Sequence, residues 1–234
     1  MLNEKFFYLY SSNLEYSNDS SFQKIKNLLI FYFFGSFIIV VVVLIIINPL
    51  DFLITRYFHL KSVNQLISLN HKKIIKFPFY IMIFIVLSIE EILFRLGFKV
   101  TKINISIFIG LTAYLLLGGK IIKFEIQNQI GIIYILITFT MAVISYFYMP
   151  SKIFDFLDIK KKWLITASII SFGTVHILNI KIFYWQLLLF YPFYVLPQMI
   201  MGFFITNLRL KYGFVWGLLL HAFFNTINFL LSRS

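Results

Sequence analysis

Residues 28–47 read LLIFYFFGSFIIVVVVLIII, twenty positions without one charged side chain. A helix of about 20 apolar residues is long enough to cross the hydrocarbon core of a bilayer. The same character extends over the whole chain, since 60% of its 234 residues are hydrophobic and only 13% are charged. The mean hydropathy of +0.89 lies far outside the range of soluble domains. The sequence therefore predicts an all-α integral membrane protein, because helices satisfy their own backbone groups in lipid.

Seven apolar segments are candidates for membrane spans, which predicts a bundle of about seven or eight transmembrane helices. Eight spans result if one run is split or if residues 50–70 re-enter the membrane. The composition, rich in Phe, Ile and Lys, favours a multi-pass protein of a bacterial inner membrane. Five segments are near or above the required length, at 28–47, 77–96, 130–149, 182–206 and 213–231, and two are shorter or more polar, at 103–119 and 163–180.

Prolines and charges mark the expected boundaries between these segments. We expect Asn48-Pro49 to end the first span, and we expect Pro192 and Pro197 to kink the run 182–206. The chain divides into a polar segment at 1–27, a first span with a basic connecting loop at 28–76, and a membrane core at 77–231. The connecting loop could hold a short interfacial helix, and further loops are expected near 99–102, 150–162 and 207–212.

The net charge of +12 arises from basic residues that are dispersed among short connections. This distribution favours contact with anionic membrane lipid over binding of a nucleic acid. The chain contains no cysteine, which excludes disulfides, thiolate metal ligands and a cysteine nucleophile. The sequence does not indicate an oligomeric state.

Glu90 and Glu91 stand side by side in the apolar run 77–96, with Arg95 one helical turn further on. Carboxylates inside a membrane are costly and usually face a polar cavity or a partner. Glu91 and Arg95 are four residues apart and share a helix face, which predicts an ion pair. Glu90 points elsewhere and has no obvious counter-charge nearby. Burial would raise the pKa of such a carboxyl, which suits a general base or acid.

Two histidines also lie within predicted spans. His176 follows Phe172 by four residues and lies close to Asn179, and His221 precedes Asn225 by four residues. Side chains at this spacing share one face of a helix and can converge on one point. A single buried histidine is more often a hydrogen-bonded core residue than a functional one. Two of them, together with a glutamate pair in the membrane, favour a functional site.

These groups can hold and activate water. A carboxylate can take a proton from water, an imidazole can orient the same water, and a second imidazole with an amide can stabilise an oxyanion. Glu90, His176 and His221 could alternatively ligate zinc, with one coordination position left open for catalysis. We favour a site without a metal or other cofactor, and zinc is not excluded.

The three patterns resemble the ordered motifs of the CAAX protease and bacteriocin-processing family, also called the ABI family. The resemblance covers about residues 77–231. It rests on Glu90-Glu91-x-x-x-Arg95, Phe172-x-x-x-His176 and His221-x-x-x-Asn225, each within a predicted span.

The resemblance implies an intramembrane endopeptidase that acts on a membrane-associated or hydrophobic peptide. Glu90 and His176 match the residues that activate water in this family. His221 and Asn225 match the residues that stabilise the tetrahedral oxyanion. The expected partners are therefore membrane lipid and a peptide or protein substrate.

Glu91 and Arg95 match the rest of the first motif, which we interpret as supporting structure. Glu90 and His176 are 86 residues apart, about twice the separation that is common in the family. The apolar segments between them, within 103–149, could be an inserted helical hairpin.

Two other functions agree with the same residues. The chain could be a non-catalytic immunity or scaffold protein that keeps the fold. It could also be a proton-coupled transporter in which Glu90 and His176 relay protons. Mutation of Glu90 separates a scaffold from the other two functions, and solute flux driven by a proton gradient distinguishes a transporter from a peptidase.

Overall fold

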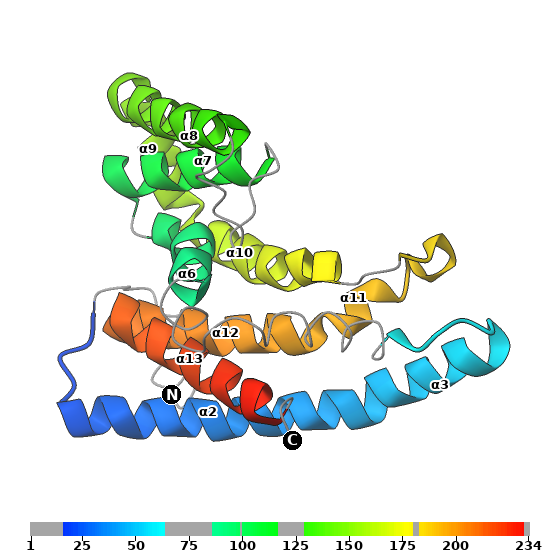
Figure 1. Cartoon of the computed structure of the whole chain (residues 1–234). Coiled ribbons are helices and arrows are strands. Elements are labelled where there is room, and N and C mark those ends of the chain that lie inside the picture. The colour runs from blue at the N-terminus through cyan, green and yellow to red at the C-terminus, as the bar shows by residue number, and fades with distance from the viewer. Residues whose placement is uncertain (1–15, 64–85, 99, 117–128, 180–182, 232–234) are drawn as a thin grey trace. The chain divides into compact units, whose positions relative to one another are not determined.

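The computed structural model describes residues 16–63, 86–98, 100–116, 129–179 and 183–231 (Figure 1). These residues form helices joined by short connections, and no strand occurs among them. The predicted all-α class is therefore confirmed for the described part of the chain.

The chain divides into two compact units, each of which is described by itself. Unit 1 comprises Met1–Ile83 and Ile169–Ser234, and unit 2 comprises Phe84–Ser168. The boundary falls within one helix, α10 (Lys161–Val175), so its first half belongs to unit 2 and its second half to unit 1.

The longest helix of unit 1 runs without a break from Ser21 to Tyr57. The prediction that Asn48-Pro49 ends the first span is therefore wrong. Proline lacks an N–H, and its ring crowds the preceding turn of an α-helix. Here the preceding turn is a wider π-helical turn in which the Asn48 N–H bonds to the Val43 carbonyl, so the proline follows without a break. The helix consists of α2 (Ser21–Val42), the π turn η2 (Val43–Ile47) and α3 (Asn48–Tyr57).

This helix is also the one described helix that is long and apolar enough by itself to cross a membrane. A second candidate arises only if two bent helices, which meet at 94° around Pro150, count as one span. These are α8 (Gln129–Tyr148) and α9 (Ser151–Ile159). The loop that we expected at 150–162 is therefore mostly helical, because Pro150 suits the position just before a helix.

Unit 2 contains the helix of the glutamate pair, α6 (Leu87–Arg95), which continues into a 3-10 turn, η4 (Leu96–Phe98). The predicted span 77–96 is thus described only in its second half. Its neighbour α7 (Lys102–Leu116) agrees with the predicted segment 103–119 as far as residue 116, and it packs against α8.

The apolar run 182–206 is divided rather than kinked. It forms a 3-10 turn, η6 (Trp185–Leu187), a single helical turn, α11 (Tyr191–Tyr194), and the start of α12 (Leu196–Tyr212). Pro192 and Pro197 lie in the first turns of α11 and α12, where a missing N–H costs no hydrogen bond. They therefore begin helices instead of bending one. The expected loop at 207–212 is the last part of α12.

Three helices form the core of unit 1, because α12 packs against both α2 and α13 (Phe214–Leu231) (Figure 1). The ring of Phe204 on α12 lies 5.7 Å from that of Phe31 on α2. The turn between α12 and α13 consists of Gly213, whose φ of 96° is a conformation that favours glycine. Because one residue reverses the chain, α12 and α13 run antiparallel from this point.

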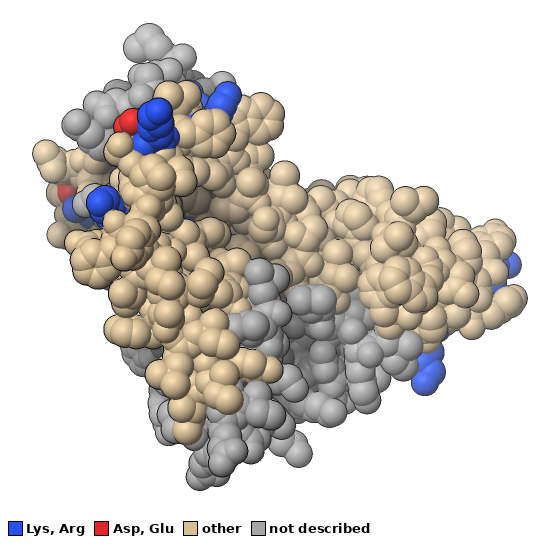
Figure 2. Space-filling view, turned by 90° about the horizontal axis from the view of Figure 1, so that it is seen from above, with Lys and Arg blue, Asp and Glu red and all other residues tan. Residues whose placement is uncertain are grey.

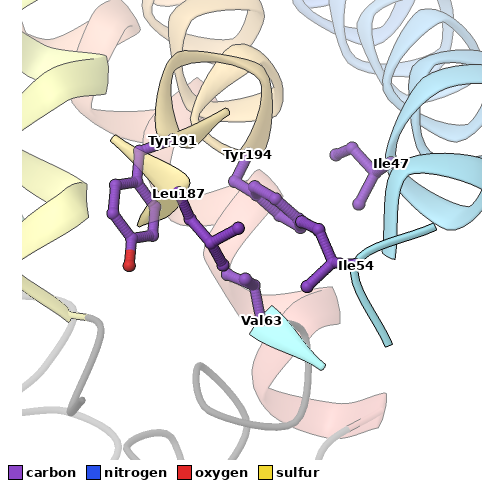
Figure 3. Close-up of a cluster of buried hydrophobic side chains, with 6 residues drawn as sticks. All are labelled: Ile47, Ile54, Val63, Leu187, Tyr191 and Tyr194. Atoms are coloured by element: carbon purple, nitrogen blue, oxygen red, sulfur yellow. The ribbon is translucent and has the colours of Figure 1, made fainter. Parts of the chain in front are cut away.

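A second buried cluster lies where the end of the long helix meets α11 (Figure 3). Apolar side chains surround a carboxylate there, that of Asp51, which is 9% exposed. Its oxygens accept hydrogen bonds from the Tyr194 hydroxyl at 2.8 Å, from the Val63 N–H at 2.9 Å and from the Ser62 hydroxyl. The cluster consists of Ile47, Ile54, Val63, Leu187, Tyr191 and Tyr194.

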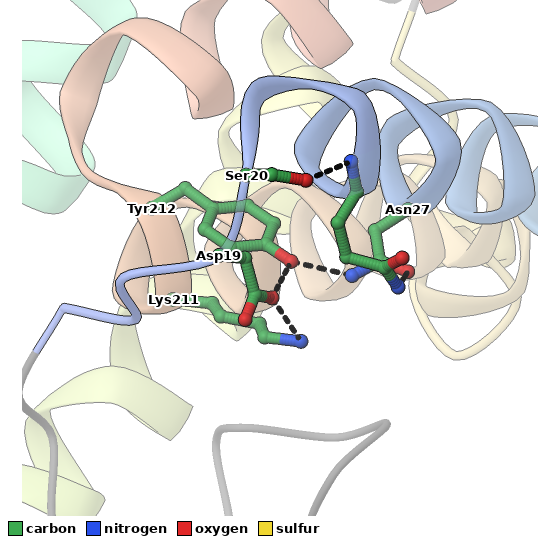
Figure 4. A network of polar contacts seen from close by, with 6 residues as sticks. Asp19, Ser20, Asn27, Lys211 and Tyr212 are labelled. Atoms are coloured by element: carbon green, nitrogen blue, oxygen red, sulfur yellow. Dashed lines mark hydrogen bonds and ion pairs between the residues drawn. The ribbon is translucent and has the colours of Figure 1, made fainter.

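A polar network ties the residues before α2 to the end of α12 (Figure 4). The Tyr212 hydroxyl donates to Asp19 at 2.5 Å, and the Lys211 ammonium lies 3.4 Å from the same carboxylate. Asn27 on α2 donates to the Tyr212 hydroxyl, also at 2.5 Å. The hydrogen bond from Tyr212 is the main cause that lowers the pKa of Asp19. Burial, followed by the bond to Asp19, raises the pKa of Tyr212.

The described surface is mostly neither basic nor acidic. On the face drawn in Figure 2 the Lys and Arg side chains form small, separate groups. Many large apolar side chains are exposed, among them Phe33 and Phe37 of α2 and Phe139 of α8. Such exposure is costly in water and is expected of a surface that faces lipid.

Candidate functional site

The Glu91–Arg95 pair is the most deeply buried polar feature of unit 2. Both side chains are 0% exposed, and the carboxylate forms an ion pair with the guanidinium. The four-residue spacing on α6 brings them together, as the sequence predicted. Removing either partner would leave a buried charge uncompensated, so the pair supports α6 rather than offering a reactive group.

Glu90 lies on a different side of α6 and is partly exposed. The spacing on the helix indicates no obvious counter-charge for Glu90, but Arg95 also interacts with Glu90 electrostatically. Arg95 thus interacts with both glutamates, and it forms its direct ion pair with Glu91. Glu90 remains the more accessible carboxylate of the two.

Within unit 2, α6 is fixed to α10. The Ser168 hydroxyl on α10 donates a hydrogen bond to the backbone carbonyl of Phe94 on α6. A serine that bonds to a carbonyl of another helix satisfies its own hydroxyl and sets the distance between the helices. The contact therefore attaches the glutamate helix to the first half of α10 within unit 2.

In unit 1, Phe172 brings the two predicted histidines together. Phe172 lies on α10 and is 0% exposed. Its ring centroid is 5.0 Å from that of His176 and 5.5 Å from that of His221 on α13. Both contacts are edge-to-face, a favoured arrangement of aromatic rings. Phe172 is the first residue of the second motif. Its ring therefore connects this motif to the third one, which begins at His221.

The position of His176 differs from the prediction in one respect. It does not lie inside an α-helix but begins the 3-10 turn η5 (His176–Asn179) at the end of α10. Its Nδ1 lies 2.7 Å from the backbone carbonyl of Phe172. A carbonyl only accepts hydrogen bonds, so Nδ1 carries the proton, and in the neutral ring Nε2 is then a base.

His221 is 1% exposed and lies on α13 with Asn225 one turn further on. The Asn225 amide donates to the backbone carbonyl of His221 at 3.1 Å. The two side chains share a helix face, but the amide is bonded to the His221 backbone rather than directed to a common point. An amide nitrogen has two hydrogens, so one N–H of Asn225 is available for another acceptor.

The six predicted residues thus fall into two groups. Glu90, Glu91 and Arg95 belong to unit 2, and the residues around Phe172 belong to unit 1. The structure brings the residues together within each unit. Among the residues that it describes, no group of three or more His, Cys, Asp or Glu side chains could hold a metal ion.

One polar residue on a helix that packs against α10 is not part of the predicted motifs. Gln198 lies in the first turn of α12, and its neighbour Met199 packs against Gly173 of α10 so closely that a Cβ at Gly173 would overlap the Met199 side chain. Gly173 directly follows Phe172 in the chain. The signal in the sequence is an amide in the apolar run 182–206, one of two with Gln186, and it stands immediately after Pro197.

Comparisons with known proteins identified no relative of this chain. No protein-family model matches the chain, and neither a curated protein nor a solved structure matches it.

Proposed function

We propose that this protein is a multi-pass membrane peptidase of the CAAX protease and bacteriocin-processing type. It would hydrolyse a peptide bond in a membrane-associated or hydrophobic peptide, with water activated by Glu90 and His176. The observation that carries the proposal is the contact of one buried ring, Phe172, with both His176 and His221. Two motifs that lie 45 residues apart in the sequence meet at this ring.

The chemistry follows from the hydrogen bonds. His176 donates from Nδ1 to the Phe172 carbonyl, so Nε2 accepts one hydrogen of a water molecule. Glu90 accepts the other hydrogen, and a lone pair of the water oxygen then points at the substrate carbonyl. As the C–O bond forms, Glu90 takes the proton and later passes it to the leaving amine when the C–N bond breaks.

The developing oxyanion is stabilised by His221 and by the second N–H of Asn225. His221 is almost fully buried, where a hydrogen bond to a charged oxygen is stronger than in water. The bond from Asn225 to the His221 carbonyl fixes the amide before the substrate arrives. A preformed donor needs no reorganisation during the reaction.

The helix of Glu90 is attached to the first half of α10. Ser168 bonds to the carbonyl of Phe94, and Phe94 lies one turn after Glu90. On α10, Phe172 follows Ser168 by one turn and therefore shares its face. This contact fixes α6, the helix that carries Glu90, within unit 2.

The membrane location rests on composition and on exposed apolar surface. The helix Ser21–Tyr57 can span a bilayer, and two shorter apolar helices, within α7 and α13, contribute further apolar surface. We propose seven or eight passes in total, as the hydropathy of the segments predicts.

The test compares peptide termini from cells that lack the protein and are complemented with wild type, Glu90→Ala or Asp155→Asn at equal membrane levels. Asp155 is an exposed carboxylate of α9 and serves as the matched control. We expect termini that occur with wild type and with Asp155→Asn but not with Glu90→Ala.

Identical termini in all complemented strains, while wild type still restores growth or another phenotype, would contradict the proposal. A scaffold would then keep its function in Glu90→Ala. A transporter would lose it and would show solute flux that depends on a proton gradient.

A further inference from the structure

A half-buried amide at the start of α12 has a shielded acceptor atom without a donor. Oε1 of Gln198 is shielded from solvent and has no hydrogen-bond partner among the residues that the structure describes. A buried polar atom of this kind destabilises a folded protein, because it has lost its bonds to water and gained none. Such atoms are uncommon in folded proteins, and a binding role is one explanation for them.

Gln198 lies close to the residues that Phe172 brings together. Met199, the next residue, packs on Gly173 of α10, and Phe172 precedes Gly173 in the same helix. The helices α10 and α12 therefore meet within one residue of Gln198.

The direction of Gln198 follows from the periodicity of α12. Gln198 and Arg209 are eleven residues apart, slightly more than three full turns, so they share one face of α12. Arg209 packs against Gly217 of α13, where a Cβ would lie 2.8 Å from the Arg209 Cβ. Gln198 therefore stands on the side of α12 that faces α13, the helix that carries His221 and Asn225.

We infer that Gln198 is a substrate-binding residue whose Oε1 accepts a hydrogen bond from a backbone N–H of the peptide substrate. The inference rests on the proposed function. A neutral carboxamide oxygen matches a neutral donor, and the peptide N–H is the donor that every peptide offers whatever its side chains. An extended peptide that passes the histidines would satisfy Gln198 on binding.

The same helix offers a matched control. Asn207 is a second amide of α12, and it is 0% exposed. It differs from Gln198 in having a partner, because its Nδ2 donates to the Phe203 carbonyl at 2.9 Å. An amide that already has a protein partner is expected to serve stability, and an amide whose acceptor lacks one is expected to serve binding.

The experiment measures KM, kcat and the thermal midpoint of purified wild type, Gln198→Leu and Asn207→Leu. The probe is a synthetic peptide that spans a cleavage site found in the comparison of termini. We expect Gln198→Leu to raise KM about five- to tenfold, as loss of one hydrogen bond does, with kcat unchanged. Its thermal midpoint should stay the same or rise. Asn207→Leu should lower the midpoint and leave KM unchanged.

Peptides methylated at one backbone nitrogen at a time identify the donor. One position should raise the KM of wild type about five- to tenfold and leave that of Gln198→Leu unchanged, because both changes remove the same hydrogen bond.

An unchanged KM in Gln198→Leu, or a lower midpoint with no change in KM, would overturn the assignment while leaving the peptidase intact. If wild type produces no termini of its own, both the proposed function and this inference fail.

Discussion

Two polar centres of unit 1 are built in opposite ways. At the first, Asp51 accepts three hydrogen bonds from groups that come from two other segments of the chain. At the second, the one hydrogen bond of the His176 ring within the described part of the chain joins Nδ1 to the Phe172 carbonyl, one turn earlier. At the start of α12, Oε1 of Gln198 has no hydrogen-bond partner among the described residues. The first centre is complete without a ligand, and the second has hydrogen-bonding capacity left over.

This difference separates stability from function. A buried carboxylate with three donors joins segments that are far apart in the sequence, and its acceptor capacity is used within the protein. A ring nitrogen or a carboxamide with unused capacity adds little to folding but can bind water or a peptide. The number of partners in the folded protein therefore predicts which measurement a mutation will change.

The largest expected effect is on the turnover of His176→Ala. Loss of a residue that orients and activates water should reduce kcat by at least about 10³-fold. The midpoint of thermal unfolding should stay close to that of wild type, because His176 is partly exposed and bonds only within its own helix. Kinetics and unfolding of the purified protein in micelles test both statements.

His59→Asn is the control for this variant. His59 is exposed and has a φ of 52°, which asparagine also tolerates. Loss of activity in both histidine variants would show that the assay reports damage to the protein rather than a role of His176.

Glu91→Ala sharpens the comparison, because Glu91 belongs to a motif but is fully paired. We expect it to behave like the Asp51 centre and to lower the free energy of unfolding by about 3–5 kcal/mol, since Arg95 would remain buried without its partner. Denaturant titration measures this loss, and Glu90→Gln is the matched variant with normal stability.

The double variant Glu91→Leu/Arg95→Met should regain most of this stability, because apolar side chains of similar volume can replace a buried ion pair. A stable but inactive Glu91→Ala protein would instead place Glu91 in the catalytic machinery.

Asn225→Ala is expected to reduce kcat by ~10²–10³, the usual effect of removing one oxyanion donor. KM should change little, because the interaction forms only in the transition state. Thr226→Ala, at the next position of α13, is the control. An Asn225 variant that changes KM alone would assign the amide to substrate binding.

Asp51→Asn tests the complete centre. Asparagine has the same volume as aspartate but no charge. Its NH2 group replaces one carboxylate oxygen, so one of the three donors loses its acceptor. We therefore expect the free energy of unfolding to fall by about 1–3 kcal/mol. The activity of each folded molecule should be unchanged. Normal stability with lost turnover would reverse the roles of the two centres.

Local patterns predicted one part of this structure and long-range contacts determined the rest. The spacing of Glu91 and Arg95 predicts their ion pair because both lie on one helix. Hydropathy predicted 130–149 almost to the residue, since α8 runs Gln129–Tyr148. The bond from Tyr194 to Asp51 joins residues 143 positions apart, and no local pattern indicates it.

The prolines show the same limit. Proline forbids a continued α-helical hydrogen bond, and the sequence shows that constraint but not the response to it. Pro49 is accommodated by a π turn, whereas Pro192 and Pro197 begin new helices. Both arrangements avoid an α-helical hydrogen bond that the proline cannot donate. Tertiary packing determines which of the two forms.

The smallest expected effect concerns the pH dependence of stability at the network around Asp19. The pKa of Asp19 is lower in the folded protein than its ordinary value of 3.8. The folded state therefore favours the carboxylate, and the stabilisation is present above the unfolded pKa and is lost as the pH falls through the folded pKa. Thermal midpoints measured between about pH 6 and pH 3 should fall less in Asp19→Asn than in wild type.

The causes of this lowered pKa rank the partner variants. The hydrogen bond from Tyr212 is the largest, and the charge of Lys211 contributes less. Tyr212→Phe should therefore reduce the acid dependence more than Lys211→Met does. The reverse order would mean that charge, rather than the hydrogen bond, ties the start of α2 to α12. A connection that depends on the charge of Lys211 would become weaker in high salt, because salt screens charges. A connection that depends on the Tyr212 hydroxyl would be largely unaffected by salt.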